Sequence, residues 1–311
     1  MTTLTLNRFG TLVAFLLLCI GFSIAAPQAF ASQANVFNLV QQMATLAIVA
    51  TAATLVMTIG EFDLSVGFSA SLAAVICFVL FGQGHEVWVA VPVALLAGLA
   101  AGAVNGVLVA RFGIPSFVAT LALGTILSGL AFGISGGQSL FRAIPDGFKS
   151  LGRGAVFGVP VLAFWIIGVL GVASFVLTQT EFGRHLRAIG GNAQAARLAG
   201  LPIVRDVIIT FAVAGGLAAL AGLLLAARLG SVQHTMGEPL LLPAYAAVFI
   251  GTTASPTGTP TVAGTLLGVA ITGVLVNGMT IVGVEPFIQR ILTGVIIIAA
   301  VLLRRIGRSA V

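Results

Sequence analysis

Charge is what this sequence has least of. Only 7% of its 311 residues are Asp, Glu, Lys or Arg, whereas 59% are hydrophobic. Soluble domains carry about 25% charged residues and about 45–50% apolar ones. A chain of this composition cannot hide its apolar surface in water, so the sequence excludes a soluble domain and indicates a protein of the bilayer.

Cysteine and histidine are also scarce. Cys19 and Cys77 both lie inside apolar runs, where a free thiol behaves as a small hydrophobic group. His85, His185 and His234 are far apart in the sequence, and none has a second ligand at a usable spacing. We therefore expect no disulfide framework, no metal site and no cofactor, and we interpret the three histidines as solvated residues of the joints between helices.

Signatures of an enzyme or of a nucleic-acid-binding protein are missing. The only lysine, Lys149, follows Phe148, so the Gly-Lys-Ser/Thr end of a Walker A loop is absent and any energy from ATP hydrolysis must come from another subunit. The segment 133–137 fits the nucleophile-elbow pattern but has no strand before it, so it is interpreted as a helix end. The net charge is +6, but the basic residues do not form a stripe with aromatic residues between them. This argues against a nucleic-acid partner.

What the sequence does contain is a series of long apolar stretches. Stretches near the roughly 20 residues needed to cross a bilayer occur at 10–30, 36–59, 65–82, 87–110, 116–135, 157–178, 207–229, 240–254, 261–282 and 287–303. They predict an all-α polytopic helical bundle of about ten transmembrane helices, in one transmembrane domain over residues 1–311. The first stretch with Ala29-Phe30-Ala31 resembles a cleavable signal peptide, but we favour a retained span.

The basic residues are unevenly shared between the two sets of joints. With ten spans, nine of the fourteen fall on the side that carries both chain ends: Arg8, Arg111, Arg184, Arg187, Arg197, Arg205, Arg304, Arg305 and Arg308. Short cytoplasmic loops are enriched in Lys and Arg. The bias predicts that both termini and the basic segment 179–206 are cytoplasmic.

Glycines recur at four-residue spacing in several spans, at Gly98, Gly102 and Gly106, at Gly129 and Gly133, and at Gly264 and Gly268. Small residues allow the backbones of membrane helices to approach closely. We therefore expect these glycines to pack helices together.

A short internal echo suggests a repeat. Val104-Asn105-Gly106 with Pro115 recurs as Val276-Asn277-Gly278 with Pro286, in spans that run in opposite directions. This arrangement is typical of an inverted repeat, with a pathway between the two halves. We expect Asn105 and Asn277 to lie near that pathway.

Two acidic residues, Glu61 and Asp63, interrupt the apolar pattern between the second and third spans. A charge at the centre of a spanning helix costs on the order of 2.5–3.5 kcal/mol, so the segment is predicted to be a break at the membrane edge or one that lines a cavity. For Asp63 we favour capping of the next helix over contact with a substrate. For Glu61 both roles remain open.

The basic segment 179–206 contains signals for a short helix. Asn192 is a good N-cap, alanines follow it, and Gly200 with Pro202 ends the pattern. A helix of about seven residues is not stable alone in water, so it must pack on something. The spacing alone leaves two partners open, lipid headgroups or a cytoplasmic protein.

Four stretches in the same order resemble the permease subunits of ribose-type ABC importers. They are Asp63-Leu64-Ser65-Val66-Gly67, the segment 115–125, the segment from Phe182 through Ile189-Gly190-Gly191-Asn192 to Gly200, and the looser 246–253. The chain departs from the family at Glu61 and Phe62, where the family usually has a glycine and a small or aliphatic residue, and at 254–260 in place of a glycine-rich segment.

The resemblance implies a multi-pass permease of the bacterial cytoplasmic membrane that passes a monosaccharide or a similar polar molecule inward. It implies four kinds of partner, namely a cytoplasmic ABC ATPase, an extracytoplasmic sugar-binding protein, a second permease copy and membrane lipid. It assigns coupling to the ATPase to Arg184, Asn192, Ala195, Arg197 and Gly200, and it favours docking for the short helix. Candidate pathway or gating residues are Asp63, Asn105, Phe117, Thr120 and Asn277.

Three alternatives stay open at this point. The first is an ion-coupled secondary transporter with Glu61 or Asp63 as its proton site. The second is a scaffold that recruits a cytoplasmic protein without moving a solute. The third is an amino-acid or nucleoside permease of the same general type, which the sequence does not separate from a sugar permease.

Overall fold

The structure is a computed structural model that describes residues 2–141, 144–255 and 258–309. The side chains of residues 2–9, 297 and 299–309 are outside this description, and with them those of Arg8, Arg304, Arg305 and Arg308. The described chain is mainly helical, as the sequence predicts.

Fourteen α-helices occur in the described ranges: α1 (Thr2–Ala25), α2 (Pro27–Phe30), α3 (Gln33–Thr58), α4 (Val66–Gly82), α5 (Val87–Ala110), α6 (Ser116–Ser135), α7 (Asp146–Arg153), α8 (Val161–Gln179), α9 (Glu181–Gly191), α10 (Ala193–Leu198), α11 (Ile203–Leu229), α12 (Leu241–Thr253), α13 (Val262–Ile281) and α14 (Pro286–Ser309). The other elements are the 3₁₀ helix η1 (Glu238–Leu240) and the hairpin strands β1 (Ala155–Val156) and β2 (Val159–Pro160).

The predicted total of about ten membrane-spanning helices is not confirmed. The predicted range 10–30 contains α1 and the short α2, each of the other predicted ranges contains one α-helix, and the additional helices α7, α9 and α10 lie in the joints. Among the described residues, six helices are long and apolar enough to cross a membrane, namely α3, α5, α6, α8, α11 and α13. The apolar parts of α1, α4 and α14 are shorter.

Two predicted boundaries are wrong for local reasons. The first span ends at Ala25 rather than near residue 30, because Pro27 forces Ala26 out of the helical conformation. The span predicted from residue 157 begins at Val161, because Phe157 and Gly158 both have positive φ and form the tight turn of the β1–β2 hairpin.

Two long helices, α3 and α11, form the centre of the bundle. Every residue of α3 from Ala44 to Met57 is buried, and α11 has buried residues from Asp206 to Ala227. α11 packs on α4 and α5, whereas α3 packs on α12 and α13. Each half of the chain therefore contributes its long helix to the helix group of the other half.

Two of the three glycine motifs pack helices together, as predicted. Gly98, Gly102 and Gly106 of α5 face the backbone or Ala219 of α11, and Gly264 and Gly268 of α13 face the backbone of α12. For Gly129 and Gly133 of α6 the prediction is wrong within this chain, because no described atom lies within 4 Å of where a Cβ would stand.

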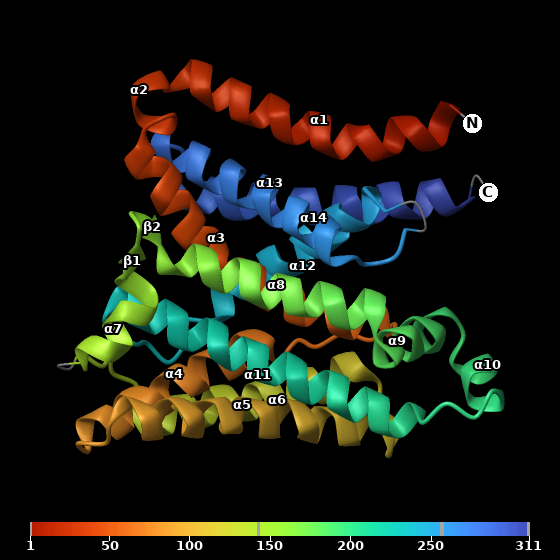
Figure 1. The fold of residues 1–311 in the computed structure, drawn as a ribbon, viewed down its shortest axis with the longest axis horizontal. Helices are drawn as coiled ribbons and strands as arrows, with labels where there is room; N and C mark the ends of the chain where they lie inside the picture. Colours follow the sequence, from red (N-terminus) through yellow and green to blue (C-terminus); the bar gives the residue numbers. More distant parts are fainter. Residues whose placement is uncertain (1, 142–143, 256–257, 310–311) are drawn as a thin grey trace.

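The bundle has two distinct ends (Figure 1). α1 begins and α14 ends at the same end, where α9 and α10 also lie, and we refer to it as the elbow end. α2, α7 and the β1–β2 hairpin lie at the opposite end. There Phe148 of α7 stacks edge-on against Phe78 and Phe81 of α4, with ring centroids 6.1 and 5.1 Å apart.

Candidate functional site

The elbow is the pair of helices α9 and α10, each of which begins at a side-chain cap. Thr180 Oγ1 accepts a hydrogen bond from the backbone N–H of Gly183 at 3.2 Å, which starts α9. Asn192 Oδ1 accepts from the N–H of Ala195 at 2.9 Å, which starts α10 as the sequence predicts. α10 has six residues, and Gly200 follows it with φ 78°, a left-handed conformation that ends a helix.

The outer face of the elbow is open to the surroundings. All five residues predicted to couple to an ATPase are exposed: Arg184, Asn192, Ala195, Arg197 and Gly200. Ala196 is the buried residue of α10 and packs the helix onto the bundle. The sequence reasoning missed Leu198, which is 85% exposed at the end of α10.

Two open depressions flank Arg197. One, of about 850 Å³, is lined by Arg197, Leu201, Pro202, Ile203, Val204, Arg205, Ile208 and Ile209. The other, of about 430 Å³, is lined by Ala193, Gln194, Arg197 and Leu198. The elbow therefore presents apolar side chains beside arginines, a combination that is enriched in protein interfaces.

α9 packs the inner face of the elbow against the rest of the bundle. Leu186 and Ile189 are buried, and the guanidinium of Arg187 donates to the Leu177 carbonyl oxygen at the end of α8. A Cβ at Gly183 would clash with the Leu177 carbonyl, and one at Gly190 would clash with the Thr58 carbonyl at the end of α3. α9 thus lies in backbone contact with both helices.

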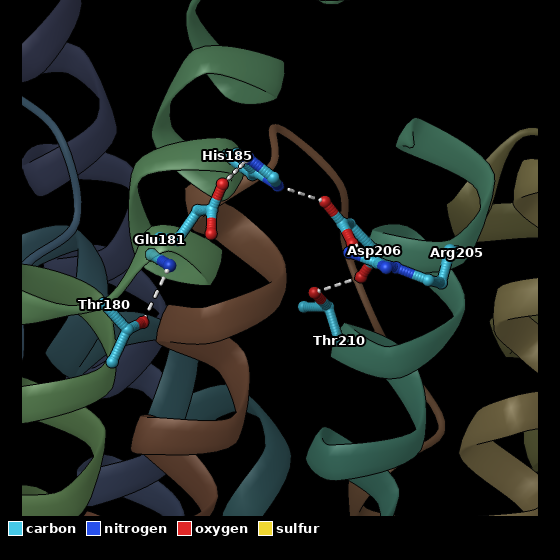
Figure 2. A network of polar contacts seen from close by, with 7 residues as sticks. Thr180, Glu181, His185, Arg205, Asp206 and Thr210 are labelled. Atoms are coloured by element: carbon cyan, nitrogen blue, oxygen red, sulfur yellow. Dashed lines mark hydrogen bonds and ion pairs between the residues drawn. The ribbon is translucent and has the colours of Figure 1, made fainter. Parts of the chain in front are cut away.

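His185 and Asp206 connect α9 to the first turn of α11 (Figure 2). His185 Nδ1 lies 2.8 Å from Asp206 Oδ2, and the Asp206 side chain is completely buried. Arg205 Nε donates to the other carboxylate oxygen at 3.1 Å, and Glu181 lies 3.7 Å from His185 Nε2. The prediction that His185 is a solvated joint residue is therefore wrong, because its side chain is only 16% exposed and is bonded to a buried carboxylate.

The second feature is the segment 59–65 between α3 and α4, which we call the break. Three of its successive backbone N–H groups, those of residues 62–64, donate to side chains of other helices. The N–H of Phe62 donates to Ser116 Oγ at 3.1 Å, and the N–H of Leu64 donates to Thr120 Oγ1 at 3.0 Å, both on α6. The N–H and C=O of Asp63 both bond to the hydroxyl of Tyr245 on α12, at 2.7 and 3.0 Å.

The side chains of the break form a buried polar group with α5. Asp63 Oδ1 accepts from the N–H of Ser65 at 2.8 Å and from its hydroxyl at 2.6 Å. Asn105 Nδ2 donates to the same hydroxyl at 2.8 Å. Asp63 thus organises the turn at the N-cap residue of α4 instead of bonding to N–H groups inside the helix. Asp63 Oδ2 and Asn105 Oδ1 are buried and have no partner among the described residues.

Three of the five predicted pathway residues meet at the break, and two lie elsewhere. Asp63, Asn105 and Thr120 are all fully buried there. Phe117 is 57% exposed on α6. Asn277 exchanges two 3.0 Å hydrogen bonds with Asn35 near the start of α3, at the opposite end of that helix from the break.

Comparison with known proteins shows to which family the chain belongs. Residues 35–301 match the family described as the permease component of branched-chain amino acid transport systems. The chain belongs to this family. It is a multi-pass permease component of a transport system.

Its relatives cover almost the whole chain. The ribose import permease protein RbsC of Escherichia coli (strain K12) is 38% identical over 94% of this chain and 92% of that protein. RbsC of Bacillus subtilis (strain 168) is 35% identical over 96% and 93%. The L-arabinose ABC transporter permease AraH of Azospirillum brasilense is 34% identical over 98% and 89%.

One solved structure shares the fold. An ABC transporter assigned to the metal-chelate type, in an inward-facing conformation, superposes with a TM-score of 0.55 over 97% of this chain and 99% of that one. The two sequences are 16% identical, so the likeness extends to the arrangement of the helices and no further.

Proposed function

We propose that this chain is the membrane-spanning subunit of an ATP-binding cassette importer, which carries a monosaccharide or a similar polar molecule into the cytoplasm. The ATP is hydrolysed on a separate chain, since this one has no Walker A loop. The sugar assignment is supported by the relatives, which are named as ribose and arabinose permeases.

The observation that carries the proposal is the form of the elbow. A six-residue helix is too short to be stable alone, yet α10 is held on the bundle by α9 while Leu198 and Arg197 remain exposed. An exposed leucine beside an arginine fits an apolar groove with an acidic rim on an ATPase. In this proposal Asn192 and Gly200 shape the helix, Arg184 and Arg197 pair with the rim, and Ala195 allows close approach.

The proposal includes the topology. We place ten crossings in the membrane, with the elbow end and both termini in the cytoplasm and the two halves related as an inverted repeat. The exchange of α3 and α11 between the helix groups supports the repeat. The whole of residues 1–311 is treated as one permease domain, which pairs with a second permease copy in lipid and receives its solute from an extracytoplasmic binding protein.

The orientation has a direct test on the exposed Gln194 of α10. In a variant with Gln194→Cys and both native cysteines replaced by alanine, a membrane-impermeant maleimide should label inverted vesicles and leave intact cells unlabelled. Labelling in intact cells would place the elbow outside the cytoplasm and contradict the proposed role.

For the pathway we propose that Asp63, Asn105 and Thr120 act at an inner gate formed by the break. Phe117 follows Ser116, to which the break is bonded, and faces outward at the start of α6. Asn277, at the far end of α3, belongs to the opposite side of the same bundle. Asn105→Leu should slow solute flux without loosening the attachment of the ATPase.

Transport itself is tested by uptake of labelled D-ribose, L-arabinose and L-leucine into vesicles that contain the permease, its ATPase and its binding protein. We expect uptake of a sugar that requires ATP and stops when the ATPase is omitted. Uptake that an uncoupler abolishes with ATP present would instead favour an ion-coupled transporter, and uptake of leucine alone would favour the amino-acid class.

Docking is tested by reversing one charge. Arg197→Glu should leave the chain in the membrane but abolish solute-stimulated ATP hydrolysis, because a carboxylate would face the acidic rim. Arg111→Glu, an exposed arginine just after α5, is the matched control and should retain stimulation. Undiminished stimulation in Arg197→Glu would remove α10 from the docking surface.

A further inference from the structure

We infer that α9 moves as a rigid helix and transmits movement of α10 to the break. Gly190 is the point at which α9 contacts the end of α3. His185 is a positioning residue that holds α9 on α11. This inference rests on the proposed function, because it assumes that an ATPase moves α10. It adds the route by which that movement reaches the buried residues of the permease.

The first step is the contact between α9 and α3. The Cα of Gly190 faces the Thr58 carbonyl so closely that any side chain would clash with it, and Gly60 of the break lies against Gly190 as well. Gly191, the next residue, has no atom within 4 Å of its Cβ position. The glycine at 190 is therefore required by the contact, and a displacement of α9 must push directly on the end of α3.

The second step is the way in which the break is connected. Its amides bond to Ser116 and Thr120 of α6 and to Tyr245 of α12, as described above. The segment between Thr58 and Ser65 is short and has few hydrogen bonds within itself. A push at Thr58 is thus passed to two other helices through single hydrogen bonds, which can exchange partners at low cost.

The third step concerns two arrangements of the break. Buried polar atoms in proteins are almost always hydrogen-bonded, and an exception calls for a physical reason. Asp63 Oδ2 and Asn105 Oδ1 are both unbonded within the described chain, and both belong to groups that bond the same Ser65 hydroxyl. In the proposed mechanism the break has a second arrangement in which these two oxygens are hydrogen-bonded. The break then has two states, as a conformational switch requires.

The last step is the attachment of α9 to α11. If α9 could slide on α11, movement of α10 would be lost there. The N–H of His185 donates to the buried carboxylate of Asp206, whose second oxygen is bonded by Arg205 (Figure 2). Hydrogen bonds to a charged, buried partner are among the stronger ones in proteins. The pair therefore holds α9 and the first turn of α11 together, so that α9 does not slide on α11.

The contact of Gly190 with the end of α3 is tested on the permease alone, in lipid nanodiscs, by hydrogen–deuterium exchange. Gly190→Ala should displace α9 and speed exchange in the peptide that contains Phe62 and Leu64 by about tenfold, since their hydrogen bonds to α6 are strained. Gly191→Ala is the matched control and should leave that peptide unchanged. Equal exchange in the two variants would overturn the inference, and this readout needs neither ATPase nor solute.

The positioning role is tested in the complete importer, and it also covers the case in which Gly190→Ala fails to fold. His185→Ala should keep the ATPase bound and hydrolysing but lower D-ribose uptake per ATP on the order of tenfold. His185→Gln, which can still donate to Asp206, should restore part of it. Glu181→Ala, which removes the weak exposed partner on the same helix, should have no effect.

These outcomes separate the inference from the function on which it rests. Unchanged uptake per ATP in His185→Ala would refute transmission through α9, while the importer itself stands. Absence of ATP-driven ribose and arabinose uptake in the unmodified chain would refute the proposed function, whatever the exchange data show for the break.

Discussion

Two helices of this permease carry glycines at the same four-residue spacing and meet opposite environments. On α5, Gly98 and Gly102 lie against the backbone of α11, where Gly215 faces them in turn. On α6, Gly129 and Gly133 face open space in the chain. The spacing shows that a close approach is possible, but the partner of a glycine face is decided by the arrangement of the whole bundle.

The difference follows from the forces between helices in a membrane. Lipid tails are as apolar as leucine, so helices associate through close packing and hydrogen bonds rather than by leaving water. α11 presents Gly215 and Ala219 to α5, so both backbones are accessible. α6 packs on α4 and α5 with its other face, where Ala119, Gly124 and Leu127 are buried. Its outward glycines remain free to meet lipid or another chain.

The largest effect is expected where two backbones touch. Gly102→Leu should destabilise the permease by about 3 kcal/mol or more, since overpacking at a rigid contact forces the helices apart. The free energy of unfolding in bicelles, followed by tryptophan fluorescence, measures the change. A loss below about 1 kcal/mol would show that α5 and α11 can separate at little cost, and it would remove the contrast with α6.

A side-chain contact between helices should matter less than a backbone contact. Asn277→Leu removes both hydrogen bonds to Asn35 and leaves that carboxamide partly unsatisfied. We expect a loss of about 1–2 kcal/mol, because two hydrogen bonds between the helices are removed and a polar group is left without them. The double variant Asn35→Leu with Asn277→Leu should recover part of it. If Asn277→Leu lowered the free energy of unfolding as much as Gly102→Leu, side-chain contacts between helices would matter as much as backbone contacts, which contradicts the expectation.

The sequence could predict the local signals of the elbow but not its attachment. Asn192 and Gly200 were recognised because capping and helix termination depend on a few neighbouring residues. α9 was missed because Gly183, Gly190 and Gly191 have low helix propensity, and its stability comes from contacts with α3, α8 and α11. These contacts are not visible in the sequence.

The pairing of His185 with Asp206 was missed for the same reason. The two residues are separated by 21 positions and lie on different helices, so no spacing rule connects them. One signal was available, since an acidic residue at the start of an apolar span needs a partner if it is buried. Asp206 stands at that place, and the flanking joint offers few donors other than arginines and His185.

The break shows a similar limit. The position of Asp63 between two apolar runs was enough to predict an interruption with a helix start after it. The hydrogen bonds to Thr120 and Tyr245 depend on how α6 and α12 approach α4, which is a property of the fold. Asn105 lies at the break and Asn277 does not, but the sequence could not separate the two. Both stand in the same Val-Asn-Gly context.

The smallest effect is expected on the outward face of α6. Gly129→Leu adds the same volume as Gly102→Leu, but the side chain enters open space, so the free energy of unfolding of the isolated permease should change by less than about 0.5 kcal/mol. Unfolding in bicelles at high dilution measures it. A loss similar to that of Gly102→Leu would mean that α6 is packed against a partner even under dilution. Because no described atom lies within 4 Å of where a Cβ at Gly129 would stand, we would assign that partner to a second copy, and the contrast between the two glycine faces would then be one between contacts within a protomer and contacts between protomers.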